Sequence, residues 1–113
     1  MYRFLGCSFA LFAACGTTPD DRPATFEYVS LTVLAPSCGT VACHSTTTQT
    51  QGYAFDTLAG ARLALRSLVS AGHPEGSRLI EVITSNQMPP DVPMLDQDVA
   101  LIEAWITNGA QGL

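Results

Sequence analysis

The stretch P-S-C-G-T-V-A-C-H-S, from Pro36 to Ser45, decides the predicted fold of this chain. Two thiols, Cys38 and Cys43, lie close together, and the imidazole of His44 follows the second thiol at once. Thiolates and imidazoles are soft or borderline donors that bind transition metals and react with cofactors. Their close spacing therefore indicates a chemical role for this stretch, and the rest of the chain is expected to enclose it.

The order cysteine, cysteine, histidine predicts covalent attachment of haem c. Two thiols add across the haem vinyl groups, and the adjacent imidazole binds the iron. The usual spacing is C-x-x-C-H, whereas the four residues from Gly39 to Ala42 separate the cysteines here. Gly39 is expected to supply the extra loop flexibility, because glycine accepts backbone angles that other residues avoid.

Three other interpretations of these residues stay open. A disulfide between Cys38 and Cys43 would close a small loop in an oxidising compartment, but it gives His44 no task. A tetrahedral zinc site would need His73 as a fourth ligand, and His73 stands alone in a turn where a solvated histidine is expected. A catalytic cysteine–histidine pair would lack a third group that orients it.

The composition indicates one acidic domain. The chain has 113 residues, with ten acidic side chains, five arginines and no lysine. Phosphate binding needs a cationic face, so nucleic acid is not expected as a partner. An acidic surface is suited to steering a basic partner protein towards the domain.

Residues 1–15 resemble a bacterial export signal. Arg3 precedes an apolar run from Phe4 to Ala14, which is too short to span a bilayer as a stable helix. The run ends in F-A-A-C, which resembles a lipoprotein signal with Cys15 as the lipidated N-terminus of the mature chain. Residues 16–24 are polar and contain two prolines, so we expect a flexible tether. The domain is then expected on the periplasmic side of a bacterial membrane, as an outer-membrane lipoprotein that contacts the membrane through its anchor only.

Residues 25–113 are expected to form an all-α domain. Apolar residues at helical spacing predict helices over Thr25–Ala35, from Asp56 or Thr57 to Ala71, over Ser77–Thr84 and over Asp96–Asn108. Pro36 is expected to end the first helix, and Gly72 to cap the second. Asp96 is expected to cap the last helix, which should pack across the first with Trp105 as its largest apolar side chain.

A second loop completes the candidate site. Residues 86–94 read N-Q-M-P-P-D-V-P-M, and the two prolines after Met88 should stiffen the backbone that presents its sulfur. A thioether is a soft, neutral donor that suits haem iron opposite a histidine, and Met88 is preferred over Met94 for this role. Tyr53 and Phe55 are expected either to close one side of the haem pocket or to pack in the core.

These segments resemble the small class I c-type cytochromes of bacteria, specifically the cytochrome c-like domains of exported proteins and lipoproteins. The resemblance rests on the cysteine–cysteine–histidine site, the G-Y-A-F return, the G-H-P-E-G-S-R-L turn, the M-P-P loop and the ending L-D-x-x-V-x-L-I-x-A-W-I-x-N-G-A. It implies a small fold of about four helices around one covalent haem c. It also implies thioether bonds at Cys38 and Cys43 and axial iron ligands at His44 and Met88.

The resemblance implies electron transfer rather than enzymatic catalysis. The chain is expected to carry one electron at a time between redox partner proteins of the cell envelope. Two alternatives of different class stay open. One is a haemless interaction module closed by a Cys38–Cys43 disulfide, and the other is a haem sensor or peroxidase-like enzyme in which Met88 leaves the iron.

Overall fold

The computed structural model describes residues 20–113, so the predicted export signal, Cys15 and the start of the predicted tether lie outside the described residues. Within 20–113 every regular element is helical and no strand occurs, which confirms the all-α class. None of the helices in this part of the chain combines the length and the apolar character needed to cross a membrane.

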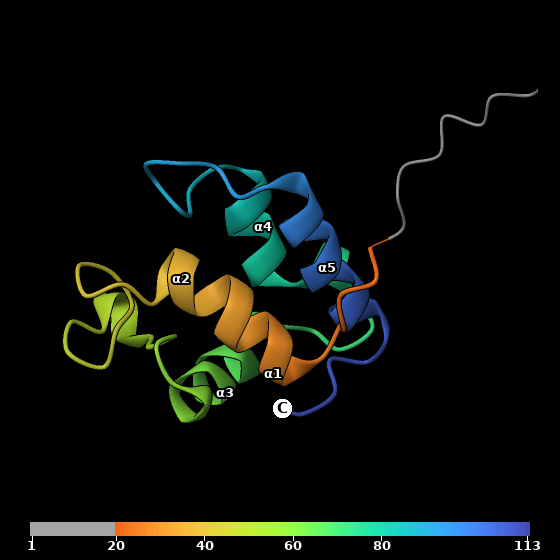
Figure 1. Cartoon of the computed structure of the whole chain (residues 1–113), viewed down its shortest axis with the longest axis horizontal. Coiled ribbons are helices and arrows are strands. Elements are labelled where there is room, and N and C mark those ends of the chain that lie inside the picture. The colour runs from red at the N-terminus through yellow and green to blue at the C-terminus, as the bar shows by residue number, and fades with distance from the viewer. Residues whose placement is uncertain (1–19) are drawn as a thin grey trace, which may run out of the picture.

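The helices form a small bundle. The elements α1 (Phe26–Tyr28), η1 (Val29–Leu34) and α2 (Ala35–Cys38) follow one another without a break and make one continuous helix. The later helices are α3 (Leu58–Leu68), α4 (Arg78–Thr84) and α5 (Asp96–Thr107), and the short 3₁₀ turns are η2 (Thr50–Gly52) and η3 (Pro74–Gly76). In Figure 1 the first helix crosses the middle of the molecule, with α3 below it and α4 and α5 above and beside it.

The first helix continues past Pro36, where the sequence predicted its end. Proline has no N–H, and in a regular α-helix its ring collides with the carbonyl group four residues earlier. The turn before Pro36 is π-helical, with the Ala35 N–H bonded to the carbonyl oxygen of Ser30, and this wider turn lies where the collision would occur. The helix therefore reaches Cys38, whose thiol is presented from a helix end instead of a loop.

The second helix is shorter than predicted. The Thr57 hydroxyl accepts a hydrogen bond from the Gly60 N–H at 3.1 Å and caps α3, which then ends at Leu68. Gly72 is not its cap. Gly72 lies in the following turn with φ +79°, and its N–H donates to the carbonyl oxygen of Ile106 at 2.8 Å. This bond links the α3–α4 connection to the end of α5.

The last helix begins one position away from the predicted cap. Leu95 occupies the cap position of α5 with extended backbone, and Asp96 is the first helical residue without capping the helix. Asp96 and Asp98 both lie in the first turn, where their negative charges stabilise the helix by interacting with the positive end of its dipole. The helix ends at Thr107 with Asn108 as its C-cap, and Gly109 follows with φ +102°.

The core lies where the first helix meets α5. Phe26 and Trp105 are each 1% exposed, and their ring centroids are 6.4 Å apart. The Trp105 indole N–H donates to the carbonyl oxygen of Gln111 at 3.1 Å, so its polar atom is satisfied. The other large apolar side chains that are fully buried are Val29, Val33, Leu34, Leu65, Ile102 and Ile106. The predicted packing of the first and last helices around Trp105 is confirmed.

The segment before α1 is attached to α5. Arg22 Nη1 donates to Asp98 Oδ1 at 2.6 Å, and Arg22 Nη2 donates to the carbonyl oxygen of Gln97 at 3.0 Å. Ala24 is partly buried against the core. Residues 16–24 are predicted to be a tether, and the structure shows that this segment contacts the domain from Arg22 onward.

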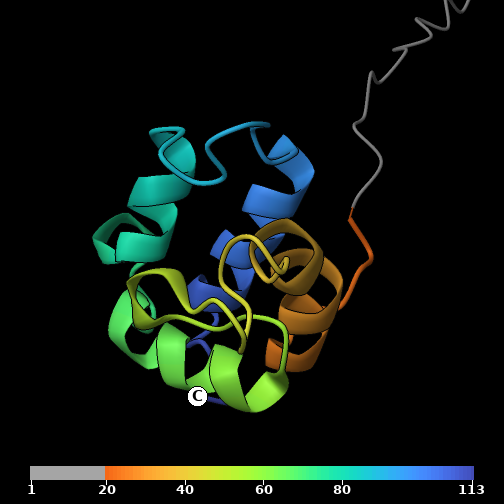
Figure 2. The same cartoon turned by 90° about the vertical axis from the view of Figure 1, so that its left-hand side faces the viewer.

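Two long connections meet at one end of the bundle. Residues 39–57 join α2 to α3, and residues 85–95 join α4 to α5. Figures 1 and 2 show both connections at the same end of the molecule, on the side that faces the viewer in Figure 2. These are the two loops that contain most of the predicted site residues.

Candidate functional site

A cavity of about 360 Å³ lies between the two long loops and helices α3 and α4. Its wall includes all four predicted cofactor residues, Cys38, Cys43, His44 and Met88. The apolar part of the wall consists of Phe55, Leu68, Leu79, Val82, Ile83, Pro89 and Pro90. The volume lies within the range of roughly 300–1,000 Å³ that is usual for small-molecule and cofactor sites.

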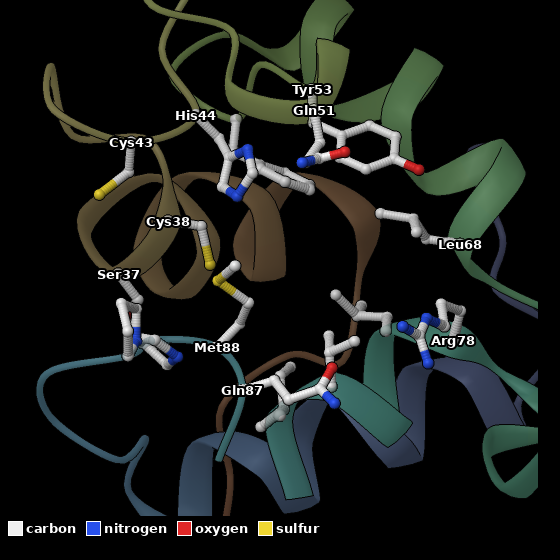
Figure 3. Close-up of a pocket in the computed structure, with 16 residues that line it drawn as sticks. Ser37, Cys38, Cys43, His44, Gln51, Tyr53, Leu68, Arg78, Gln87 and Met88 are labelled. Carbon is white, nitrogen blue, oxygen red and sulfur yellow. The ribbon is translucent and has the colours of Figure 1, made fainter. Parts of the chain in front are cut away.

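The imidazole of His44 is held in one tautomer. Its Nδ1 atom lies 2.7 Å from the carbonyl oxygen of Thr50, and a carbonyl oxygen only accepts hydrogen bonds. Nδ1 is therefore the donor, and Nε2 carries the free lone pair of the neutral ring. His44 is only 8% exposed, and Figure 3 shows its ring pointing into the cavity. A histidine held in this way is ready to bind a metal through Nε2.

Backbone hydrogen bonds hold the loop around His44. The His44 N–H donates to the carbonyl oxygen of Cys38 at 2.9 Å, and the His44 carbonyl oxygen accepts from the Phe55 N–H at 2.6 Å. Asp56 ties the outer part of the same loop, because its carboxylate accepts from the Thr46 N–H and from the Thr46 hydroxyl, both at 2.9 Å. These bonds to Thr46 lower the pKa of the Asp56 carboxyl, and the backbone bond contributes most.

The two cysteines carry free thiols on the cavity wall. Figure 3 shows Cys38 at the end of α2 and Cys43 on the loop that follows, at the same side of the cavity. Burial, and to a lesser extent the nearby Cys43, raises the pKa of the Cys38 thiol to about 11. In the described residues the pair is not joined in a disulfide, so the structure does not contain the predicted alternative cross-link.

Gly39 is required for a close approach and not for a special backbone angle. Its φ and ψ are −87° and 16°, which other residues adopt as well. A Cβ atom at this position would lie 2.8 Å from the carbonyl oxygen of Ala35 and from backbone atoms of Phe55 and Asp56. The expectation that Gly39 supplies flexibility is therefore wrong. The missing side chain allows the backbone of Phe55 and Asp56, just before α3, to lie directly on the end of α2.

The two candidate methionines lie in different surroundings. Met88 lines the cavity, and Figure 3 shows its sulfur-bearing end extending from the wall opposite His44. The Met88 N–H donates to the carbonyl oxygen of Val82 at 2.9 Å, which ties the start of the M-P-P segment to α4. Met94 does not line the cavity and packs partly buried against the core. The geometry thus favours Met88 as the sulfur that faces His44.

Aromatic side chains enclose the imidazole on one side. The ring centroid of His44 lies 5.7 Å from that of Phe55, edge to face, and 6.0 Å from that of Tyr53. Both aromatic residues also line the cavity, and Phe55 is 4% exposed. Pocket wall and core packing were the two alternatives predicted for the G-Y-A-F return. Phe55 satisfies both, because it belongs to the core and also lines the cavity.

The predicted zinc alternative is not supported by the geometry. His73 lies in an exposed turn beside η3, and its Nδ1 atom is 3.2 Å from the Glu75 carboxylate. Among residues 20–113, no three histidine, cysteine or acidic side chains come close enough to hold a metal ion. His73 is the solvated histidine that the sequence predicted.

Four polar residues of the cavity were not predicted from the sequence. Ser37, Gln51, Arg78 and Gln87 all line it, and Arg78 extends from the start of α4. The sequence signal for Arg78 is its place in the G-H-P-E-G-S-R-L turn, but nothing in that turn indicates which loop it will face. Its position depends on how α4 packs against α3.

The donor set and the wall fit a haem. The thiols of Cys38 and Cys43 lie on one side of the cavity. The imidazole of His44, with Nε2 free, faces the thioether of Met88. Apolar side chains form much of the remaining wall. Histidine and methionine are the ligand pair of c-type cytochromes, and a largely apolar wall limits the access of water to the iron. The residues present can therefore hold a covalent haem.

Comparison with known proteins agrees with this chemistry. Residues 41–91 match the family model described as Planctomycete cytochrome C. The matched segment contains Cys43, His44 and Met88 and begins after Cys38, so it does not include the first cysteine of the widened spacing. No curated protein and no solved structure matches the chain. The match supports a cytochrome c-like domain, that is, a haem-binding electron-transfer protein of a family whose cofactor is covalent haem c.

Proposed function

We propose that this chain is a one-electron carrier with haem c bound through Cys38 and Cys43 and ligated by His44 and Met88. The observation that carries the proposal is the convergence of these four side chains on one cavity, with the Nδ1 atom of His44 engaged and its Nε2 atom free. When bound, the haem supplies a single reversible electron as its iron alternates between the ferrous and ferric states.

The protein side chains perform the attachment and the positioning. On attachment, the S–H of each cysteine would add across one vinyl group, with the sulfur and its hydrogen on neighbouring carbons, so no leaving group would be released. The π-helical turn and the close contact at Gly39 set the position of Cys38, while the bonds of the Cys43–Asp56 loop set that of His44. A histidine and methionine pair raises the reduction potential relative to more basic ligands.

The exchange of electrons requires partners, which we propose to be redox proteins of the cell envelope. The N-terminal pattern that resembles a lipoprotein signal supports a position on the periplasmic side of a bacterial membrane, anchored through lipid on Cys15. After loss of a leader that contains Arg3, ten acidic residues would face four arginines, a formal charge of −6. Such a surface favours basic partners and an electron-transfer rate that falls as ionic strength rises.

The proposal is tested by comparing Met88→Leu with Met94→Leu in the haem-loaded protein. Loss of the sulfur ligand should lower the midpoint potential by more than about 59 mV, which corresponds to a tenfold change in the ferrous-to-ferric ratio. It should also let carbon monoxide bind the ferrous protein. Met94→Leu should change neither property. A wild-type protein that binds carbon monoxide readily would contradict the carrier and favour the sensor or peroxidase-like enzyme.

A further inference from the structure

The spacer between the two cysteines, residues 39–42, forms a compact turn. The Cys43 N–H donates to the carbonyl oxygen of Thr40 at 2.9 Å. The His44 N–H donates to the carbonyl oxygen of Cys38, also at 2.9 Å, and so joins the two ends of the motif across the whole spacer. The last three residues of the spacer are exposed. The additional residues of the widened spacing therefore bulge towards solvent, while the second cysteine stays close to the end of α2.

Thr48 holds the outer part of this spacer. Its hydroxyl donates to the carbonyl oxygen of Val41, and its N–H donates to the Ser45 hydroxyl at 3.2 Å. Ser45 is 3% exposed and directly follows His44, so this second bond fixes Thr48 to the inner part of the loop. Among residues 20–113, no other side-chain hydrogen bond involves the spacer. Thr48 is thus the side chain that links the spacer to the rest of the described loop.

Attachment at two points requires a defined separation of the two sulfurs. The vinyl groups of haem belong to neighbouring pyrrole rings of a rigid macrocycle, so both thiols must match one spacing at the same time. The C-x4-C spacer has two residues more than the usual motif, and their backbone freedom is lost when both sulfurs are bonded. A spacer that is already held in one conformation loses less freedom on attachment.

We propose that Thr48 is a positioning residue for haem attachment, which holds the widened spacer so that Cys38 and Cys43 both bond to one haem. On attachment, each S–H would add across one C=C bond and form one C–S and one C–H bond, so the step would need no oxidant. Thr48 does not line the cavity, and it acts through the carbonyl oxygen of Val41. This inference rests on the proposed function.

A shortened chain separates this role from general support of the loop. Deletion of Thr40 and Val41 leaves C-G-A-C-H, which has the usual spacing. The deletion also removes the carbonyl oxygen that the Thr48 hydroxyl holds. Loss of this hydroxyl should therefore reduce double attachment in the chain with the wide spacer and leave it unchanged in the shortened chain.

The number of thioether bonds is measured on the full chain, produced in the periplasm with a cytochrome c maturation system. Free thiols are alkylated, and cleavage after glutamate releases residues 28–75, which contain no cysteine besides Cys38 and Cys43. The mass of this fragment distinguishes haem held by two thioethers from haem held by one thioether beside one alkylated thiol.

Thr48→Val keeps the shape of the side chain and removes the hydroxyl. It should lower the ratio of doubly to singly attached chains about threefold to tenfold, as expected for one lost hydrogen bond. Thr48→Ser should restore the wild-type ratio. Thr47→Val is the matched control, because Thr47 is exposed on the same loop and its side chain forms no hydrogen bond in the described structure. Thr48 is exposed as well, so its substitution leaves the core intact.

Equal ratios in Thr48→Val and Thr47→Val, in a protein whose wild type carries haem through both sulfurs, would overturn the role of Thr48 alone. An equal loss caused by Thr48→Val in the shortened chain would overturn it too, because Thr48 would then support the loop and not the spacer. A wild type that carries no covalent haem would overturn the proposed function and this inference together.

Discussion

The Nδ1 atom of His44 lies 2.7 Å from the carbonyl oxygen of Thr50, and this bond selects the tautomer whose Nε2 faces the cavity. The carbonyl is held in place by an unusual backbone. Gln49 and Gln51, on either side of Thr50, have φ values of 44° and 58°, in the left-handed region that costs a residue with a side chain about 1–2 kcal/mol. Strain of this kind persists where the surrounding structure requires it, often at functional sites.

Gln49→Pro tests this relationship, because proline fixes φ near −65° and removes the N–H that bonds to the Ser45 carbonyl oxygen at 2.8 Å. We expect the Thr50 carbonyl to shift and the bond between His44 and the iron to weaken in the loaded protein, measured from the absorption spectrum. Gln49→Gly is the matched control, since glycine adopts the native angle and should stay within about 1 kcal/mol of wild type. Equal spectra for the proline variant and wild type would argue against a role for the bond.

The Asp56 carboxylate should stabilise the haem loop only while it is ionised. Its bonds from Thr46 hold the pKa of the carboxyl below the ordinary value of 3.8, so the contribution is present above pH 3.8 and is lost as pH falls through the lowered pKa. Asp56→Asn should therefore lower the midpoint temperature of unfolding at pH 7, and this effect should disappear as pH falls through the lowered pKa of the Asp56 carboxyl. Asp91→Asn, on the other loop, serves as the control and should change little. A pH-independent difference for Asp56→Asn would point to lost packing instead.

Gly39→Ala should destabilise the protein by about 1–3 kcal/mol, the usual cost of forcing extra atoms into a packed site. The added Cβ would lie 2.8 Å from backbone atoms on both sides, so neither neighbour can move by a simple side-chain rotation. The yield of haem-loaded protein should fall as well, because the same contact sets the position of Cys38. Chemical unfolding of Gly39→Ala beside the exposed Thr40→Ala measures this, and equal stabilities would refute the close approach.

Ser30→Ala is expected to raise the free energy of unfolding by about 1 kcal/mol. Ser30 is 1% exposed, and its hydroxyl has no hydrogen-bond partner among the described residues. A buried hydroxyl without a partner carries a desolvation cost that alanine removes. Urea unfolding of the variant measures the change. A loss of stability would mean that the hydroxyl has a partner in solution, such as an ordered water molecule.

The helices were predictable because their signals are local. The spacing of Leu79, Ile80 and Ile83, and of Ile102 and Ile106, follows from one helical face and agrees with the burial observed. The same local reasoning failed at Pro36. A proline usually ends a helix, and the π-helical turn that accommodates it depends on packing of the first helix against the core, which no local pattern records.

The sequence predicted which residues form the candidate site, but not the contacts that hold them in position. Cys38, Cys43, His44 and Met88 were expected from residue types and their order, and all four line one cavity. The oxygen that fixes His44 belongs to the backbone of Thr50, and any residue type carries such an oxygen. The contact at Gly39 joins segments that are remote in the sequence. Neither contact can therefore be predicted from a local sequence pattern. Arg78 reaches the cavity only through the packing of α4.

Covalent attachment of haem at the widened spacing is tested most directly on a denaturing gel. The full chain is produced in the periplasm with a cytochrome c maturation system, beside the Cys38→Ala/Cys43→Ala double variant and a control cytochrome, and the gel is stained for haem peroxidase activity. We expect haem to remain with the wild-type band and to be absent from the double variant. A colourless wild-type band, in cells where the control cytochrome matures, would contradict the electron carrier and leave Cys38 and Cys43 to be examined as a disulfide.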